Sequence, residues 1–343
     1  MSELVEMKIG SRLIGPGHPV FVVAEIGATH HGRLDYALTL IELAKRCGAH
    51  AVKLQTVDPD WSYVKGTASY EIFTSLKLPK EHLVKMKQAA DQLGLILFTT
   101  PGDWPSLELA LELDFQLMKI SSGLMTNSPL VEAVAKTGRP LIVSSGMAYL
   151  DEIGRTVRIA RDAGCTNIAA LHCTSVYPAP DRILNLRAIG LMSDSLQIPV
   201  GYSDHTNDSF ACTIAVAAGA CLLEKHLAIS KELAGPEAGT ACDPDEFKAA
   251  VDQVNRATAM LGRRIKAPMP EEQEGRKLFR RSIIARHAIP AGKRIEKDDI
   301  GLMRGTIDHV GLPPELYFEI IGRRATRAIA ANEPIRMDCV GEN

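Results

Sequence analysis

Eight short stretches rich in β-forming residues alternate along this chain with longer stretches that have the apolar periodicity of helices. The strand candidates are residues 21–25, 51–55, 96–99, 117–120, 141–144, 168–172, 200–202 and 222–226. Helical patterns fall between them, for example over residues 36–47, 80–93, 128–136, 150–163, 210–218 and 244–261. Several of these patterns end at glycine, a common helix stop. Eight strands separated by helices predict an α/β fold, a parallel (β/α)8 TIM barrel.

The composition changes after Gly262, and this change predicts a second domain. Residues 1–265 are expected to form the barrel, with a short hairpin from residues 7–10 and 19–20 that plugs its bottom. Residues 266–281 are charged and proline-containing, and are expected to be a linker. Short strands resume at Ser282, so residues 282–343 are expected to be a small domain, which at about 60 residues gains from packing on another surface.

Bulk composition excludes several classes of function. With 46% hydrophobic residues the chain has ample material for a large core, and its formal charge of −2 gives no long-range field for nucleic acid or anionic membranes. The first ten residues lack a basic region followed by an apolar run, so we expect a cytoplasmic protein without membrane contact. Seven cysteines without a Cys-x-x-Cys pair are expected to be buried, reduced thiols.

Polar and charged residues gather where the predicted strands end, which is the edge that lines the active site of a TIM barrel. They are Glu25, Lys53, Lys119, Ser122, Ser144, Ser145, His205 and His226. A lone lysine after a strand is usually solvated, but two with interleaved serines favour an anion site. Lys53 and Lys119 would clamp a phosphate, while the hydroxyls of Ser122, Ser144 and Ser203 hold carboxylate or phosphate oxygens.

Two histidines indicate a possible metal site. His205 and His226 lie one βα period apart, so they would approach from adjacent strands. Such a pair is about as often hydrogen-bonded structure as metal ligation. Glu25 on the same rim favours an open site for a divalent ion, and Mn²⁺, Zn²⁺ and Fe²⁺ all suit these ligands. His30 and His31, in the loop after the first barrel strand, are weaker candidates.

Several motifs together resemble the sialic acid synthase family, nearly end to end. They are Ala24-Glu25-Ile26-Gly27 with His30 and Gly32, Val52-Lys53-Leu54-Gln55-Thr56, Ser144-Ser145-Gly146-Met147, Leu171-His172-Cys173-Thr174 with Tyr177-Pro178, Gly201-Tyr202-Ser203-Asp204-His205-Thr206 and Glu224-Lys225-His226. The tail is similar to the family's antifreeze-like (SAF) domain, through Arg280-Arg281-Ser282 and Ile289-Pro290-Ala291-Gly292.

This resemblance implies a cytoplasmic enzyme that condenses phosphoenolpyruvate with the open-chain aldehyde of an N-acylated amino sugar. The products are a nine-carbon 2-keto-3-deoxy acid and phosphate, and the expected assembly is a domain-swapped homodimer. Residues that match the family's phosphoenolpyruvate contacts are Lys53, Lys119, Ser122, Ser144 and Ser203. His205 and His226 match its two metal ligands, which usually carry Mn²⁺, and the expected substrate-binding set is completed by Gln55, Ser175, Tyr177 and Arg304.

The acceptor side departs from the family pattern at three positions. Leu124 stands where the family has an acid, Ser175 replaces an asparagine, and Glu237 replaces an aspartate. Glu237 or Glu25 is expected to carry the proton that the missing acid would move. Arg304 matches an arginine that in the family reaches into the partner subunit's site, although a solvated arginine on a small domain is the alternative.

Three hypotheses follow from these residues. The first is a synthase acting on N-acetylmannosamine or a close relative such as a diacetamido sugar. The second, favoured by the three departures, is the same chemistry on a different aldehyde in a specialised pathway. The third is a non-catalytic sugar-phosphate binder that kept the fold. Retention of both lysines and both histidines argues against the third hypothesis.

Overall fold

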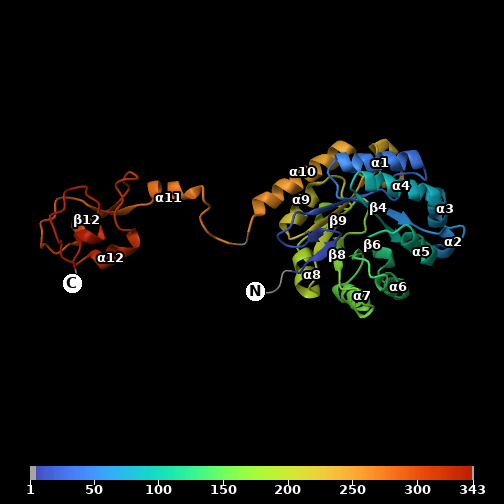
Figure 1. Ribbon diagram of the computed structural model, residues 1–343, viewed down its shortest axis with the longest axis horizontal. Coiled ribbons are helices and arrows are strands. Elements are labelled where there is room, and N and C mark those ends of the chain that lie inside the picture. Colours follow the sequence, from blue (N-terminus) through green and yellow to red (C-terminus); the bar gives the residue numbers. More distant parts are fainter. Residues whose placement is uncertain (1–4, 264, 342–343) are drawn as a thin grey trace. The chain divides into compact units, whose positions relative to one another are not determined.

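Eight parallel strands close into a barrel in the computed structural model, which describes residues 5–263 and 265–341 (Figure 1). The strands are β3 (Phe21–Glu25), β4 (Ala51–Thr56), β5 (Ile96–Pro101), β6 (Met118–Ile120), β7 (Leu141–Ser144), β8 (Ile168–Cys173), β9 (Val200–Asp204) and β10 (Leu222–His226). Strands consecutive in the chain are neighbours in the sheet, and β10 pairs with β3 to close it. The predicted strands and the predicted barrel are therefore confirmed.

Helices cover the outside of this barrel (Figure 1). They are α1 (Leu34–Arg46), α2 (Pro59–Ser62), α3 (Ala68–Leu76), α4 (Lys80–Gln92), α5 (Trp104–Glu112), α6 (Ser128–Lys136), α7 (Leu150–Asp162), α8 (Ala188–Leu196), α9 (Phe210–Ala217) and α10 (Pro244–Leu261). Local sequence sets where they begin: Asp103 accepts a hydrogen bond from the Ser106 amide at 2.8 Å at the start of α5. Asp243 and Glu246 form a reciprocal capping box at the start of α10.

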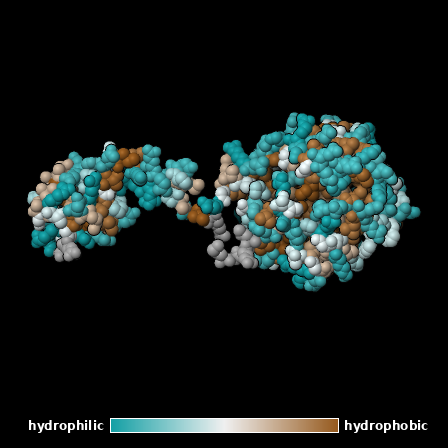
Figure 2. Space-filling view, viewed as in Figure 1, coloured by the Kyte–Doolittle hydropathy of each residue, from teal (hydrophilic) through white to brown (hydrophobic). Residues whose placement is uncertain are grey.

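The main core lies between the barrel and its helices. In α1 the buried residues Ala37, Leu40, Ile41 and Ala44 follow the i, i+3, i+4, i+7 spacing of one helix face. All seven cysteines are buried free thiols in the described chain, which confirms that prediction. Figure 2 shows mostly hydrophilic residues on the visible face of the barrel unit, interrupted by hydrophobic patches. No helix within residues 5–263 and 265–341 has both the length and the apolar character needed to span a membrane.

A hairpin closes the bottom of the barrel, as predicted, but with a different second strand. β1 (Met7–Ile9) pairs with β2 (Arg12–Ile14), not with residues 19–20, which lead into β3. The tight turn places Gly10 at φ +58°, which glycine adopts without strain. Met7, Ile9 and Ile14 are buried against residues at the starts of the barrel strands. Each such side chain contributes about 1.5–3 kcal/mol through removal from water.

The chain divides into two compact units, Met1–Arg263 and Arg264–Asn343. The second unit contains α11 (Glu272–Phe279), β11 (Ser282–Ala285), β12 (Ile300–Met303) and α12 (Tyr317–Ile320). β11 and β12 are antiparallel, and an isoleucine-rich core lies under them. The strand expected at Ser282 is present, while the stretch predicted as a linker, residues 266–281, includes α11.

Candidate active site at the carboxyl ends of the barrel strands

A polar cavity of about 850 Å³ lies at the carboxyl ends of the barrel strands. Most of the site residues predicted within the barrel line it; the exceptions are Ser145, Glu237 and the weaker metal candidates His30 and His31. The predicted residues that line it are Glu25, Lys53, Gln55, Lys119, Ser122, Ser144, Ser175, Tyr177, Ser203, His205 and His226. The convergence follows from the fold, because the ends of all eight parallel strands meet at one mouth.

Two lysines and two carboxylates form a buried cluster in the wall of this cavity. Lys53 pairs with Glu25, and its ammonium also lies 3.8 Å from Glu224 Oε2. Lys119 Nζ lies 3.3 Å from the same Glu224 oxygen, and the Ser203 hydroxyl donates to Glu224 Oε1 at 2.9 Å. Glu224 therefore holds both ammonium groups on one side of the cavity.

Burial and charge act in opposite directions on this cluster. Burial raises the pKa of Glu224, but the ammonium groups of Lys119 and Lys53 oppose it and bring that pKa down to about 2. For Lys119, burial lowers the pKa and Glu224 offsets only part of this effect. Sequence reasoning missed the role of Glu224. The alternation of side chains along β10 could have revealed it, because successive residues of a strand face opposite sides. Glu224 and His226 therefore point into the barrel and Lys225 points outward.

Serine hydroxyls surround the space beside the lysines. Ser144 Oγ is buried and has no hydrogen-bond partner among the described residues. Ser122 Oγ accepts a hydrogen bond from the Gly146 amide at 3.0 Å. A Cβ at Gly146 would come within 2.1 Å of Ser175 Oγ and 2.8 Å of Ser122 Oγ, so glycine is what allows these hydroxyls to lie together. An oxyanion is the kind of ligand that such a group of donors can satisfy.

The two predicted metal ligands lie side by side, with ring centroids 5.5 Å apart. His205 Nδ1 donates to the Thr174 carbonyl at 2.9 Å, since a carbonyl can only accept. His226 Nδ1 donates a hydrogen bond to a Glu237 carboxylate oxygen at 2.8 Å. Both contacts leave Nε2 as the nitrogen free to ligate, the arrangement usual for histidines that hold metals.

These residues fit a divalent ion bound by two protein ligands. Within the described part of the chain, no three His, Cys, Asp or Glu side chains cluster as a complete metal site. The remaining positions would therefore belong to substrate and water, which is the open form of site that catalysis needs. His31 donates to the Leu233 carbonyl at 2.7 Å and makes a structural contact there.

A second buried ion pair lies behind the histidines, on the outward side of β9 and β10. Lys225 Nζ is 2.9 Å from Asp204 Oδ2 and donates to the Thr206 carbonyl at 2.7 Å. Asp204 also accepts from the Thr206 amide at 2.9 Å. This network fixes the turn on both sides of His205. It was not predicted, because outward positions on a barrel strand are usually apolar.

An aromatic groove lies next to the cavity on the side of Leu124. Trp61, Tyr63, Phe73 and Trp104 line it together with Leu124, and its volume is about 940 Å³. Gln55, Ser121 and Gly123 line both the groove and the polar cavity. The predicted change from acid to Leu124 therefore falls at the border between the two spaces.

Arg304 belongs to the second unit, Arg264–Asn343. Its guanidinium lies 4.3 Å from the centre of the Phe279 ring, and Nε donates to the Leu278 carbonyl at 3.1 Å. The side chain is exposed, and its reach into a partner's site stays a prediction.

Buried lysines, serines and two oriented histidines at the mouth of a (β/α)8 barrel are typical of a barrel enzyme with a polar active site. The chain belongs to the NeuB family, which matches residues 40–266, and a SAF domain matches residues 280–341. The predicted antifreeze-like domain is thereby confirmed.

Individual relatives cover most of the chain. An uncharacterized protein of Methanocaldococcus jannaschii is 39% identical over 87% of this chain and 89% of its own length. The N,N'-diacetyllegionaminic acid synthase of Legionella pneumophila is 35% identical over 92% of this chain and 93% of its own. The crystal structure of an N-acetylneuraminic acid synthetase from Leptospira borgpetersenii, 30% identical, superimposes with a TM-score of 0.77 over 80% of this chain and 96% of that one. The chain is accordingly an enzyme of this synthase type, a transferase.

Proposed function

We propose that this enzyme condenses phosphoenolpyruvate with the open-chain aldehyde of an acylated amino sugar, giving a 2-keto-3-deoxy sugar acid and phosphate. The observation that carries this proposal is one cavity that holds the Lys53–Glu224–Lys119 cluster, the unpartnered Ser144 hydroxyl and two oriented histidines. The relatives from Legionella pneumophila and Leptospira borgpetersenii are named as synthases of two different sugar acids. The acceptor's identity is therefore the variable part of the proposal.

The donor half of the reaction uses the lysines and serines. Phosphoenolpyruvate carries its phosphate and carboxylate close together, and the paired ammonium groups with adjacent hydroxyls match that charge pattern. As the C2–O bond to phosphate breaks, Lys53 and Lys119 stabilise the charge that collects on the departing group. Glu224 lies close to both ammonium groups, and its negative charge favours the protonated form of each lysine.

The bond changes balance with two proton transfers. C3 of phosphoenolpyruvate bonds to the aldehyde carbon, a water oxygen adds at C2, and the C2–O bond to phosphate then breaks. One proton of that water goes to the aldehyde oxygen and the other to the departing phosphate, which leaves a ketone at C2. Glu25 lines the cavity and accepts from the Gln55 amide at 3.2 Å, so it is the carboxylate placed to pass the proton to the aldehyde oxygen. Glu237 lies behind His226 and acts as a positioning residue instead.

His205 and His226 would hold a divalent metal through Nε2, and Mn²⁺ is the ion we propose. A bound divalent ion supplies Lewis acidity toward the aldehyde oxygen and toward water. The chain's own part is to orient both rings, through the Thr174 carbonyl and Glu237.

The test is phosphate release from phosphoenolpyruvate with Mn²⁺ and a panel of aldehydes, with product masses recorded. The panel includes N-acetylmannosamine, diacetamido-hexoses and arabinose 5-phosphate. We expect release that depends on an acylamino aldehyde. If only arabinose 5-phosphate supports release, the acceptor is a phosphorylated sugar and not an acylated amino sugar. If no aldehyde supports release, the proposed reaction is wrong.

Leu124→Glu should raise kcat/KM for N-acetylmannosamine by at least about tenfold, because a placed acid or base contributes about 10²–10⁴-fold to such proton transfers. Leu124 is half-buried at the border of the cavity and the groove, so a carboxylate there would reach both. Leu124→Gln is the matched control, with the same shape and no charge. If both variants are as active as the parent, position 124 alone does not set the choice of acceptor, and Ser175 and Glu237 contribute to it.

We extend the proposal to a domain-swapped homodimer in which Arg304 completes the partner's site. Its support is the exposed guanidinium, which stacks on Phe279 and makes no ion pair among the described residues. Mixing an Arg304→Ala variant with a Lys119→Met variant should restore part of the activity, because one of the two sites in a mixed dimer is then intact. If mixed dimers form and show no recovery of activity, Arg304 does not complete the partner's site.

A further inference from the structure

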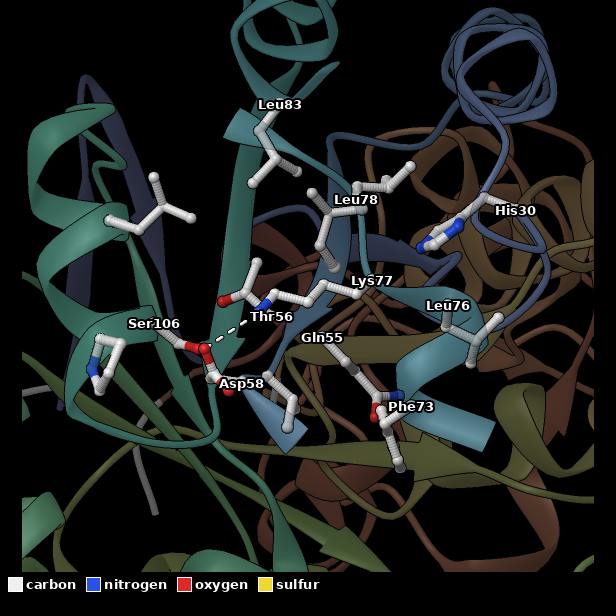
Figure 3. Close-up of a pocket in the computed structure, with 14 residues that line it drawn as sticks. His30, Gln55, Thr56, Asp58, Phe73, Leu76, Lys77, Leu78, Leu83 and Ser106 are labelled. Atoms are coloured by element: carbon white, nitrogen blue, oxygen red, sulfur yellow. Dashed lines mark hydrogen bonds and ion pairs between the residues drawn. The ribbon is translucent and has the colours of Figure 1, made fainter. Parts of the chain in front are cut away.

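A side cavity of about 590 Å³ lies beside the polar site, between β4 and the helices α3, α4 and α5 (Figure 3). Its walls are mainly apolar, and include Leu54, Phe73, Leu78, Leu83 and Leu109. The cavity is partly open to solvent, and the space between these walls can take a small substituent of a substrate bound at the mouth.

Gln55 links this side cavity to the chemistry. It lines the polar cavity and the side cavity, and its amide donates to Glu25 Oε1 at 3.2 Å. Val57 and Phe73 wall both the side cavity and the aromatic groove next to Leu124. The side cavity therefore borders the part of the mouth where an acceptor, not phosphoenolpyruvate, would extend.

A buried histidine, His30, lines this space. His30 is 3% exposed, and in Figure 3 its ring points toward the other labelled residues. Its Nδ1 accepts from the Gly32 amide at 3.0 Å, so the proton of the neutral ring is on Nε2. Burial lowers the pKa of His30 to about 4, which keeps the ring neutral at pH 7. Nε2–H is then a donor without a partner among the described residues.

The charge of the cavity favours a neutral ligand group over a phosphorylated one. Within the described chain its single ammonium, on Lys77, is already paired with Asp58 at 3.0 Å at the edge of the cavity. A phosphate would find no unpaired cation. An amide carbonyl suits a single neutral donor, and an alkyl group suits the leucine and phenylalanine walls.

We infer that the side cavity binds an acylamido substituent of the acceptor, whose carbonyl accepts from His30 Nε2–H and whose alkyl chain lies against Leu54, Phe73 and Leu109. This inference rests on the proposed function. His30 is a positioning residue: it touches a remote part of the substrate and does not take part in bond making. Acceptors with acyl chains longer than acetyl should therefore be accepted, and should bind more tightly.

The test compares 2-acylamido-2-deoxymannoses that carry acetyl, propanoyl or butanoyl groups, with phosphate release as the readout. In the parent enzyme KM should fall about fourfold for each added methylene, with kcat nearly constant, because each buried methylene has a favourable transfer energy. Leu78→Trp, which fills the cavity, should abolish this trend. Ile72→Trp is the matched control, since Ile72 lies on α3, is exposed and does not line the cavity.

His30 variants test the hydrogen bond separately. His30→Leu should raise KM about tenfold for all three acceptors and leave kcat within about twofold, from the loss of one buried hydrogen bond. His30→Gln, which keeps a donor, should recover part of that loss. Phosphate release with a KM independent of acyl length and of these variants would overturn the inference while the proposed function stands. No release with any aldehyde would overturn both. The acyl series in the parent enzyme needs no variant, so misfolding of a variant does not remove the test.

Discussion

Lys119→Met should lower kcat/KM for phosphoenolpyruvate by at least about a hundredfold, the scale of loss when one placed donor is removed from a developing negative charge. Lys119 is 2% exposed, and its ammonium lies 3.3 Å from Glu224 within the polar cavity. Methionine keeps most of the volume and removes the charge. Steady-state phosphate release at varied phosphoenolpyruvate concentration is the measurement.

The same substitution should also reduce stability, because Glu224 is left with only one of its two cations. Breaking one partner of a buried ion pair typically costs about 3–5 kcal/mol, whereas neutral replacement of both partners costs much less. Adding Glu224→Gln to Lys119→Met should thus recover the thermal midpoint but not the activity. That separation distinguishes a lysine that binds substrate from one that only supports the fold.

An exposed lysine provides the control for loss of charge. Lys136 pairs with Glu132 along α6, with its side chain 62% exposed, and Lys136→Met should leave kcat/KM near that of the parent. Unchanged kcat/KM in Lys119→Met, with folding verified, would remove Lys119 from the donor site and with it the phosphate clamp.

The barrel and most of its mouth could be predicted because both depend on short-range regularities. Strands such as 51–55 and 222–226 stand out by their length and spacing, and a parallel barrel brings every strand end to one place. Lys53 and His226 could therefore be assigned to a common site from their positions alone. The alternation of side chains along β10 also puts Glu224 on the inward face, next to the site, but this role of Glu224 was not predicted from the sequence.

The remaining features depend on contacts that no local pattern encodes. Glu237 was one of two residues expected to move a proton, and its contact with His226 could not be foreseen from any local pattern. The side cavity at His30 is lined by residues of β4, α3, α4 and α5, which lie far apart in the sequence, so its existence follows from tertiary packing. The hairpin partner at Arg12–Ile14 was missed because three-residue strands carry almost no periodic signal.

Replacing either metal-site histidine should remove most bound divalent ion and nearly all activity. The proposed metal site has two imidazole ligands, so His205→Ala or His226→Ala leaves a single imidazole, which together with substrate and water holds the ion only weakly. Elemental analysis after dialysis with Mn²⁺ measures retention, and phosphate release measures activity. We expect metal content well below one equivalent, and activity reduced by about a thousandfold or more, since polarisation of a carbonyl by a metal is worth several kcal/mol.

Glu237→Gln and His172→Ala make this prediction specific. Glu237 hydrogen-bonds Nδ1 of His226, the nitrogen that faces away from the proposed metal. Loss of such a partner costs about 10–100-fold in metal affinity, so Glu237→Gln should retain metal at saturating Mn²⁺ and lose it at low Mn²⁺. His172 also stands near the end of a barrel strand, but its Nε2 donates to the Leu184 carbonyl at 2.7 Å and the residue does not line the cavity. His172→Ala should keep the metal. A graded series, with the two histidines lowest, Glu237→Gln between and His172→Ala highest, is what the geometry requires, whereas full retention in both His205→Ala and His226→Ala would move the metal site elsewhere.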